Sequence, residues 1–294
     1  HIINIMTGNN IVLNEPLSRH TSWKVGGPAD IFFTPNDRND LSDFLKSNDC
    51  IITWLGNGTN ILVRDDGVRG AVISTRKSLN KIELIDQSNY LVEVGVSCFE
   101  LAMYATKNNF GPAAFFSGIP GSIGGALTMN AGCFGNETWE FVKSVEVMDR
   151  NGEIHQLDPE EFSISYRSVG FPFPLWFLSC VMSFPEEGFT TIEELKSMRD
   201  SRLERQPLTE NTCGSVFKNP DGNYAGDLIE RSGLKGFRLG GCAVSEKHAN
   251  FIVNDKEATA SDIETLIKHI QKTVKDHYGI DLETEVRIIG EYHE

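Results

Sequence analysis

The sequence predicts a protein of the α+β class that is divided into two domains. The chain has 294 residues, which corresponds to about two domains at roughly 150 residues each. Apolar runs typical of strands alternate with amphipathic segments typical of helices along the first part of the chain. Near residue 188 this pattern gives way to longer and more highly charged helical segments. We therefore expect a domain boundary between residues 185 and 205.

The first hundred residues are predicted to alternate strands with one helix. Short apolar runs predict strands at 29–34, 51–55, 70–74 and 90–94. The run 51–55 has the composition of a buried strand and ends at the turn-forming residues that follow it. A helix is predicted over 37–48, because Leu41, Phe44 and Leu45 fall on one face.

A second helix and a hairpin are predicted in the middle of the chain. Ser97 and Glu100 have the spacing of a capping box, which begins a helix over 97–108. The apolar positions of that helix are Phe99, Leu101, Ala102 and Ala105. Strands at 142–149 and 152–157 follow, and Asn151-Gly152 predicts a type I′ hairpin turn between them.

The last third of the chain is predicted to be rich in helices. Helices are expected at 191–204, 224–232 and 261–278, with a final strand at 285–289. The longest helix is predicted to begin with a capping box of Ser261 and Glu264 and to end at Gly279. One apolar stripe would face the core through Ile263, Leu266, Ile267, Ile270 and Val274.

Composition excludes several classes of protein. The chain carries 27 Lys and Arg against 41 Asp and Glu, a net charge of −14, whereas a nucleic-acid binder usually has a basic surface. No run reaches the roughly 18 apolar residues of a membrane span. The six cysteines are widely spaced and have no zinc-site pattern, so we expect reduced thiols, no metal site and a cytoplasmic protein. They are Cys50, Cys98, Cys133, Cys180, Cys213 and Cys242.

A first glycine-rich segment follows the predicted strand 51–55. Its sequence is G-N-G-T-N-I over residues 56–61. Consecutive backbone N–H groups in such a turn can bind the diphosphate of a nucleotide. The segment is not a dinucleotide fingerprint of the G-x-G-x-x-G kind, because Ile61 stands where the third glycine would be and no helix pattern follows. A tight hairpin is the alternative.

A second segment, 118–132, contains glycine at five of its fifteen positions. A backbone with so few side chains allows a flat or phosphorylated ligand to approach closely. A flexible linker is the alternative, although Ile119, Ile123, Leu127 and Met129 supply apolar anchors that a linker would not need.

Six motifs in order resemble one family, the UDP-N-acetylenolpyruvoylglucosamine reductases of peptidoglycan synthesis. They are T-x-W-x-V-G-G at 21–27, G-N-G-T-N at 56–60, G-I-P-G-x-x-G-G-A-x-x-M-N-A-G at 118–132, S-Y-R at 165–167, G-S-V-F-K-N-P at 214–220 and E-V-R at 285–287. The resemblance implies a two-lobed FAD-binding region of the vanillyl-alcohol-oxidase/PCMH type over 17–187. A smaller α/β substrate-binding domain would occupy 188–294.

The resemblance also implies an activity, that of a UDP-N-acetylmuramate dehydrogenase. Members of the family use NADPH to reduce a non-covalently bound FAD. Hydride from the reduced flavin then reduces the enolpyruvyl ether of UDP-N-acetylglucosamine, which gives UDP-N-acetylmuramate. The partners are therefore NADPH and the sugar nucleotide, and we expect a monomer that binds neither nucleic acid nor membrane.

Three residues match the catalytic residues of the family. Ser215 matches the proton donor, although its hydroxyl could instead cap a turn. Arg167 matches the arginine placed against the enolpyruvyl carboxylate, where a planar, permanently charged guanidinium offers two parallel hydrogen bonds. Glu285 matches the glutamate that assists the same intermediate, for which a raised pKa would be useful.

Further residues match the family's binding sites. Those implied for FAD are Gly56, Asn57, Gly58, Thr59, Asn60 and Ile61 at the diphosphate, and Gly118, Ile119, Ser122, Gly124, Gly125 and Asn130 along the ribityl and flavin side. Those implied for the sugar nucleotide are Tyr166, Arg202, Arg205, Lys218 and Asn219, with His248 and Asn250 as weaker candidates.

Two features of the chain separate it from related classes. Arg167 and Ser215 are only 48 positions apart, without an insertion carrying a tyrosine, so the chain resembles the loop-less class (type II) of the family. A hydroxy-acid or sugar-lactone oxidase on a similar flavin domain is an alternative, but many of these tether FAD through a histidine. No histidine lies between His20 and His155. A non-catalytic nucleotide-binding protein is the other alternative.

Overall fold

The computed structural model describes residues 10–108, 111–185 and 190–291. Five of its six α-helices lie where helices were predicted, whereas α3 falls in the second glycine-rich segment, where no helix was predicted. They are α1 (Arg38–Ser47), α2 (Cys98–Lys107), α3 (Ile123–Met129), α4 (Ile192–Arg205), α5 (Ala225–Arg231) and α6 (Ala260–Tyr278). Short 3₁₀ turns lie at Leu17–Arg19, Gly111–Gly118, Thr138–Glu140 and Pro159–Glu161. Within the described ranges, no helix combines the length and apolar character needed to cross a bilayer.

The strands form several sheets. The larger sheets are made of β1 (Ile11–Pro16), β2 (Pro28–Phe33), β3 (Ile52–Leu55), β5 (Val68–Ser74), β6 (Ile82–Leu84), β7 (Asn89–Glu93), β10 (Val142–Asp149), β11 (Ile154–Leu157) and β14 (Leu175–Ser183). The shorter strands are β4 (Ile61–Val63), β8 (Gly132–Cys133), β9 (Asn136–Glu137), β12 (Ser163–Ser165), β13 (Ser168–Gly170), β15 (Arg238–Leu239), β16 (Cys242–Val244), β17 (Ile252–Asn254) and β18 (Arg287–Ile289). The chain is thus of the predicted α+β class.

The chain divides into two compact units, each built from several segments. The first contains residues 1–12, 31–57 and 70–199, and the second contains residues 13–30, 58–69 and 200–294. The domain ranges 17–187 and 188–294 stay a prediction.

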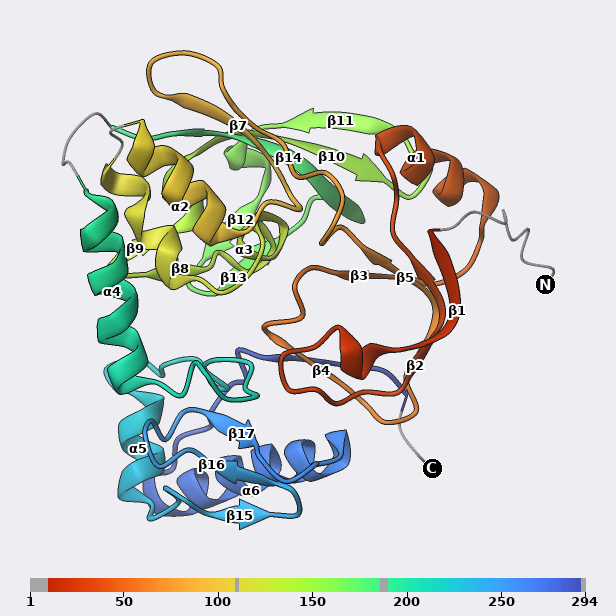
Figure 1. Ribbon diagram of the computed structural model, residues 1–294. Helices are drawn as coiled ribbons and strands as arrows, with labels where there is room; N and C mark the ends of the chain where they lie inside the picture. Colours follow the sequence, from red (N-terminus) through yellow and green to blue (C-terminus); the bar gives the residue numbers. More distant parts are fainter. Residues whose placement is uncertain (1–9, 109–110, 186–189, 292–294) are drawn as a thin grey trace. The chain divides into compact units, whose positions relative to one another are not determined.

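The first unit is organised by an antiparallel sheet of order β11-β10-β14-β7-β6. In Figure 1, β10, β14 and β7 run beside one another, and α3 packs on β7 and β14. The core between these layers is fully buried at Tyr90, Phe116, Leu178 and Phe184. A four-stranded sheet of order β1-β2-β5-β3 also occurs, in which β3 and β5 are parallel.

The second unit is organised around α6. This helix packs against α5, β15 and β16 (Figure 1), and all five residues of its predicted stripe are buried. The strands β15, β16 and β17 form a small antiparallel sheet. In this unit β4 pairs in parallel with β18, so that Ile61 lies opposite Arg287.

Two predicted helix starts have different outcomes. The capping box of Ser97 and Glu100 is present at α2 in both of its hydrogen bonds. The capping box predicted at Ser261 and Glu264 is wrong, because Thr259 and Asp262 form it two residues earlier. Glu264 instead forms an ion pair with Arg64, at 2.9 Å, so its carboxylate serves the packing of the unit.

Other details also differ from prediction. The hairpin of β10 and β11 is present, but its turn is not type I′, because Gly152 has φ +76° and Asn151 has no positive φ. In β3 only Leu55 is buried, so this strand is less buried than its composition suggests. Phe99 is exposed on α2, because the buried face of that helix is formed by its other apolar residues.

Candidate functional site

The first glycine-rich segment, 56–61, joins β3 to β4. The hairpin alternative is wrong, because β3 pairs with β5 and β4 pairs with β18. The segment passes from the first unit to the second between Asn57 and Gly58. Gly58 has φ +66°, and a Cβ there would lie 1.9 Å from the carbonyl oxygen of His20. Only glycine therefore fits at this position.

The two glycine-rich segments meet within the first unit at Ser122. Ser122 is buried and is the N-cap of α3, where its Oγ accepts a hydrogen bond from the Gly125 N–H at 3.3 Å. A Cβ on Gly56 would lie 2.8 Å from the same Oγ. A Cβ on Gly125 would have only this Oγ within 4 Å, at 3.7 Å. Gly56 and Gly125 thus leave bare backbone next to one buried hydroxyl.

The second segment is ordered structure, so the linker alternative is wrong. Most of 111–129 is helical, and Ile119, Ile123 and Leu127 are buried. Two of its glycines are needed for packing. A Cβ on Gly118 would lie 2.4 Å from the Cys133 Sγ, and one on Gly124 would lie 3.0 Å from the Val94 Cβ.

The side chain of Arg167 is held against the turn that follows α3. Its Nη1 donates to the Asn130 carbonyl oxygen and to Glu137 Oε1, both at 3.2 Å. Its Nη2 donates to the Gly132 carbonyl oxygen at 3.0 Å. The guanidinium carbon lies 4.9 Å from the ring centroid of Tyr166, and the side chain is 16% exposed. Arg167 is therefore partly buried, as predicted, and its charge has a carboxylate partner.

The predicted proton donor and the predicted glutamate lie on paired segments of the second unit. The Glu285 N–H donates to the carbonyl oxygen of Val216, which follows Ser215, at 2.8 Å. A further bridge joins Phe217 and Thr284. Asn60 adds a link, because its side-chain amide donates to the Glu285 carbonyl oxygen at 3.1 Å. The second unit thus brings together one half of the predicted diphosphate loop and both predicted catalytic segments.

Asn250 holds the Ser215 segment from its side chain. Its Oδ1 accepts from the Phe217 N–H at 3.0 Å, and its Nδ2 donates to the Phe217 carbonyl oxygen at 2.9 Å. Its own carbonyl oxygen accepts from the Val216 N–H at 2.9 Å. Asn250 is buried, and its side-chain amide gives the backbone N–H and C=O of Phe217 the hydrogen bonds that a neighbouring strand would otherwise supply.

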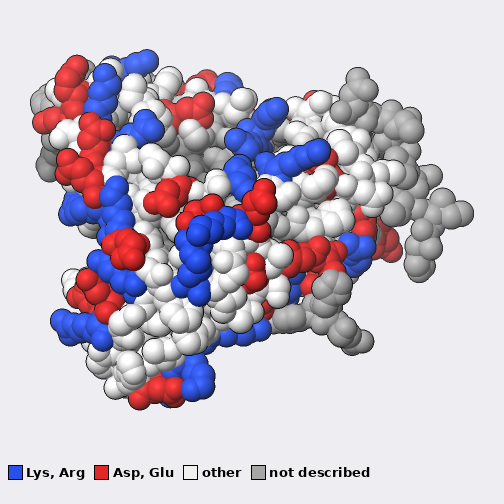
Figure 2. Space-filling model, turned by 60° about the horizontal axis from the view of Figure 1, so that its bottom comes forward, with Lys and Arg blue, Asp and Glu red and all other residues white. Residues whose placement is uncertain are grey.

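The cations predicted for the sugar nucleotide are each bound locally. Lys218 Nζ lies 2.7 Å from Glu283 Oε1. On α4, Arg202 Nη2 donates to Gln206 Oε1 and Arg205 Nη2 donates to Ser201 Oγ, each at 2.7 Å. Asn219 caps α5, because its Oδ1 accepts from Ala225 N–H at 3.0 Å. Figure 2 shows basic and acidic side chains interspersed on the face that it presents.

Sequence reasoning missed three residues beside the predicted site. Glu137 contacts Arg167, as described above. The Cys213 thiol donates to the Ile61 carbonyl oxygen at 3.4 Å, and burial raises its pKa to about 12, so it serves packing rather than chemistry. Ser117 Oγ is buried and has no hydrogen-bond partner among the described residues. No local sequence pattern distinguishes these three residues, because the importance of each depends on its contacts or its burial in the folded chain.

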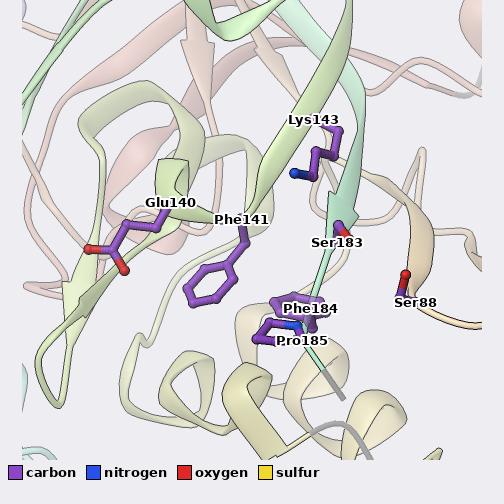
Figure 3. A pocket seen from close by; sticks show the side chains of 7 residues that line it. All are labelled: Ser88, Glu140, Phe141, Lys143, Ser183, Phe184 and Pro185. Carbon is purple, nitrogen blue, oxygen red and sulfur yellow. The ribbon is translucent and has the colours of Figure 1, made fainter. Parts of the chain in front are cut away.

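A hollow of about 510 Å³ lies elsewhere in the first unit. Figure 3 shows the rings of Phe141, Phe184 and Pro185 close together at its base, with Lys143 and Ser183 above them. None of the predicted site residues lines this hollow. Across the described part of the chain, no group of three or more His, Cys, Asp or Glu residues could hold a metal ion.

Comparison with known proteins identifies the family. Residues 206–289 match the C-terminal domain of UDP-N-acetylenolpyruvoylglucosamine reductase, and residues 29–158 match an FAD-binding domain. The UDP-N-acetylenolpyruvoylglucosamine reductase of Methylococcus capsulatus is 46% identical over 95% of this chain and 92% of that protein. The chain belongs to the UDP-N-acetylenolpyruvoylglucosamine reductase family. It is thus an FAD-dependent oxidoreductase, as predicted.

Two further relatives agree with this family assignment. The enzyme of that name from Legionella pneumophila (strain Paris) is 44% identical over 96% of this chain and 94% of that protein. The crystal structure of the Thermus caldophilus UDP-N-acetylenolpyruvylglucosamine reductase is 30% identical and has a TM-score of 0.77, covering 95% of this chain and 97% of that one. The predicted fold class is confirmed by this structural match and by the FAD-binding domain.

The residues of the first unit fit a bound FAD. Ser117 Oγ is a buried hydroxyl that lacks a partner in the described structure, and a polar cofactor would supply one. Gly56 and Gly125 form a side-chain-free surface beside Ser122. Gly56, Gly125 and Ser122 lie on the two segments that sequence reasoning selected for the cofactor, and Ser117 directly precedes the second of them.

Proposed function

We propose that the protein reduces UDP-N-acetylglucosamine enolpyruvate to UDP-N-acetylmuramate with NADPH, in peptidoglycan precursor synthesis. The observation that carries this proposal is the pairing of the Ser215 segment with the Glu285 segment. Reduction of an enolpyruvyl double bond needs a proton at one carbon and stabilisation of charge on the carboxylate. The hydrogen bond from Glu285 N–H to Val216 O, at 2.8 Å, holds a hydroxyl and a carboxyl on neighbouring stretches of backbone.

We propose distinct roles for the three predicted catalytic residues. Ser215 would donate the proton. Arg167 would bind the substrate carboxylate, for which a guanidinium is suited because it stays charged and offers two donors in one plane. Glu285 would hydrogen-bond the same intermediate.

We propose that FAD is held non-covalently by the two glycine-rich segments. Its residues would be Gly56, Asn57, Gly58, Thr59, Asn60, Ile61, Gly118, Ile119, Ser122, Gly124, Gly125 and Asn130. When bound, FAD accepts hydride from NADPH and delivers hydride to the substrate. Gly125 would admit the cofactor, while Gly56, Gly118 and Gly124 shape the two segments through their close packing on Ser122, Cys133 and Val94.

We propose that the substrate contacts are Tyr166, Arg202, Arg205, Lys218 and Asn219. Lys218 would have to exchange its contact with Glu283 for the substrate, and this is feasible because Glu283 is 72% exposed and such a pair contributes little stability. NADPH and the sugar nucleotide are both large anions, so we propose that they use the site in turn.

We propose that the enzyme is a cytoplasmic monomer of the loop-less class. The absence of tyrosine from 168–214 supports the class. Six free thiols in the described structure, four of them buried, suit a reducing compartment. Light scattering of the purified protein tests the monomer.

The deciding experiment measures NADPH oxidation with and without UDP-N-acetylglucosamine enolpyruvate. We expect rapid oxidation only when the substrate is present, together with UDP-N-acetylmuramate detected by mass spectrometry. An oxidase of hydroxy acids or sugar lactones would instead consume oxygen with its own substrate. A protein that binds FAD but turns over neither substrate would contradict the proposal.

A further inference from the structure

The carboxylate of Glu137 lies between two residues of the proposed site. Its Oε1 is 3.2 Å from Arg167 Nη1, and its Oε2 is 2.8 Å from Asn130 Nδ2. Glu137 is in β9, which pairs with β8 in a two-stranded ribbon. All three residues belong to the first unit. One carboxylate thus joins the residue proposed for the substrate carboxylate to a residue proposed for FAD.

Both partners of Glu137 have backbone conformations that need support. Arg167 has φ +52° and Asn130 has φ +49°, in the left-handed region that favours glycine. Asparagine tolerates this region, whereas arginine rarely adopts it. Residues in such conformations persist when the surrounding contacts hold them. For Arg167 these contacts are the carbonyl oxygens of Asn130 and Gly132 and the carboxylate of Glu137.

Asn130 is fixed by its place at the end of α3 and by hydrogen bonds from both ends of its side-chain amide. It is buried and is the C-cap of α3. Its Oδ1 accepts from the Trp139 N–H at 3.1 Å, and its Nδ2 donates both to Glu137 and to the Ser165 carbonyl oxygen. A carboxylate that binds this amide is therefore anchored to the end of α3. The orientation of Glu137 in turn limits where the Arg167 guanidinium can lie.

We propose that Glu137 is a positioning residue for Arg167, fixing its guanidinium relative to the end of α3 for contact with the substrate carboxylate. This inference rests on the proposed role of Arg167. The Arg167 guanidinium is permanently charged and could rotate among its three acceptors, which are the Asn130 and Gly132 carbonyl oxygens and the Glu137 carboxylate. The substrate carboxylate, which the guanidinium must also bind, arrives only with the substrate. The ion pair with Glu137 keeps one edge of the guanidinium bound before the substrate arrives. A fixed orientation saves the cost of ordering this side chain in each turnover.

A double-mutant cycle in the two half-reactions tests the inference. In stopped-flow experiments with the holoenzyme, Glu137→Ala should leave flavin reduction by NADPH within about twofold of the wild type. Reoxidation by the enolpyruvyl sugar nucleotide should slow by about 10- to 100-fold, because misplacing one charged contact has effects of this size. In an Arg167→Ala background, Glu137→Ala should add less than about twofold.

Three comparisons keep the test falsifiable. Glu140→Ala changes an exposed carboxylate three residues away and should alter neither half-reaction. If Glu137→Ala does not yield a flavin-loaded protein, Glu137→Gln serves, because its amide keeps the shape, removes the charge and has only one oxygen for the two donors on Arg167 and Asn130. Glu137→Asp should restore part of the rate, since the charge is kept.

The outcomes separate the inference from the proposed function. Equal slowing by Glu137→Ala with and without Arg167 would show that Glu137 acts on the fold and not through Arg167. An unchanged reoxidation rate would also overturn the inference while leaving the function intact. A wild-type protein that does not turn over the enolpyruvyl sugar nucleotide would overturn both.

Discussion

The surroundings of Arg167 and those of Ser215 are held in different ways. In the first unit, Arg167 has a left-handed backbone conformation, and its side chain is bound to two carbonyl oxygens and the Glu137 carboxylate. In the second unit, the residues after Ser215 are held through their backbone, by pairing with 284–286 and by the Asn250 amide. One functional group is therefore positioned by its own side-chain contacts, and the other by the backbone hydrogen bonds of the segment that carries it.

This difference separates function from stability in the two regions. The side-chain contacts of Arg167 can change without disturbing a hydrophobic core. We therefore expect substitutions of Arg167 to change substrate binding and the reaction rate. Backbone pairing beside Ser215 lies next to the buried residues Val216 and Phe217, so substitutions of its partners should reduce stability first.

Replacing the proposed proton donor should have the largest effect. We expect Ser215→Ala to slow reoxidation of the flavin by substrate by about 10²- to 10⁴-fold, the usual contribution of a general acid. Flavin reduction by NADPH and the unfolding midpoint should change little, because the Ser215 segment is held through its backbone. Stopped-flow absorbance measures both half-reactions, and Ser261→Ala, at an exposed serine, is the control. An unimpaired reoxidation rate would remove Ser215 from this role.

Removing the amide of Asn250 should chiefly reduce stability. Asn250→Ala leaves the buried N–H and C=O of Phe217 without their partner, at about 1–3 kcal/mol for each unsatisfied group. We therefore expect a loss of about 2–4 kcal/mol in the free energy of unfolding, measured by urea denaturation. Asn223→Ala, at an exposed asparagine, should stay within about 0.5 kcal/mol of the wild type. If Asn250→Ala kept the wild-type stability but lost activity, the Ser215 region would not be one in which substitutions reduce stability first.

Substituting lysine for Arg167 should reduce the rate without unfolding the protein. A lysine ammonium cannot offer two parallel donors to a carboxylate, and hydrogen bonds to charged groups contribute about 1.5–3 kcal/mol. We expect kcat/KM for the sugar nucleotide to fall by about 10- to 100-fold for Arg167→Lys. Arg238→Lys, at an exposed ion pair with Asp255, is the matched control and should be neutral. Wild-type turnover in Arg167→Lys would contradict the assignment.

A small pH effect on stability is expected near the Ser215 segment. Burial lowers the pKa of His248 below its ordinary value of 6.5, and the charge of Lys235 adds to this. Above about pH 6.5 the imidazole is neutral in both the folded and the unfolded chain, so it contributes no pH dependence. As the pH falls from 6.5 to the lowered pKa, only the unfolded chain takes up the proton, and stability therefore falls.

Urea denaturation between pH 5 and pH 8 measures this effect. His248→Gln should flatten the part of the curve below about pH 6.5. If the curve of His248→Gln has the same slope there as the wild type, other groups account for the pH dependence.

Local sequence signals predicted the fold well where neighbours in sequence decide the structure. The α2 capping box is correct because Ser97 and Glu100 bind each other's backbone within one turn. The start of α6 could not be chosen locally, because both Thr259 and Ser261 have an acidic residue three positions later. Asp65, almost 200 residues earlier, binds the N–H groups of Ala260 and Ser261 and favours the earlier start.

The candidate site shows the same limit. Glycine spacing and the family resemblance selected Gly56 and Ser122, which the first unit brings into contact. They did not select Glu137, because its importance comes from Arg167, which is 30 residues away in sequence. They also could not tell open glycines from packed ones, since that distinction depends on the neighbours of each absent Cβ.

The pairing of β4 with β18 has a consequence for biosynthesis. Val63 lies opposite Ile289, a separation of 226 residues, and a ribosome adds roughly 5–20 residues per second. For about 10–45 s after β4 is made, its apolar edge has no partner strand. Nascent chains of this protein should therefore depend on chaperones that shield such edges until synthesis reaches residue 289. The residues of the first unit, all of which precede residue 200, have by then been synthesised.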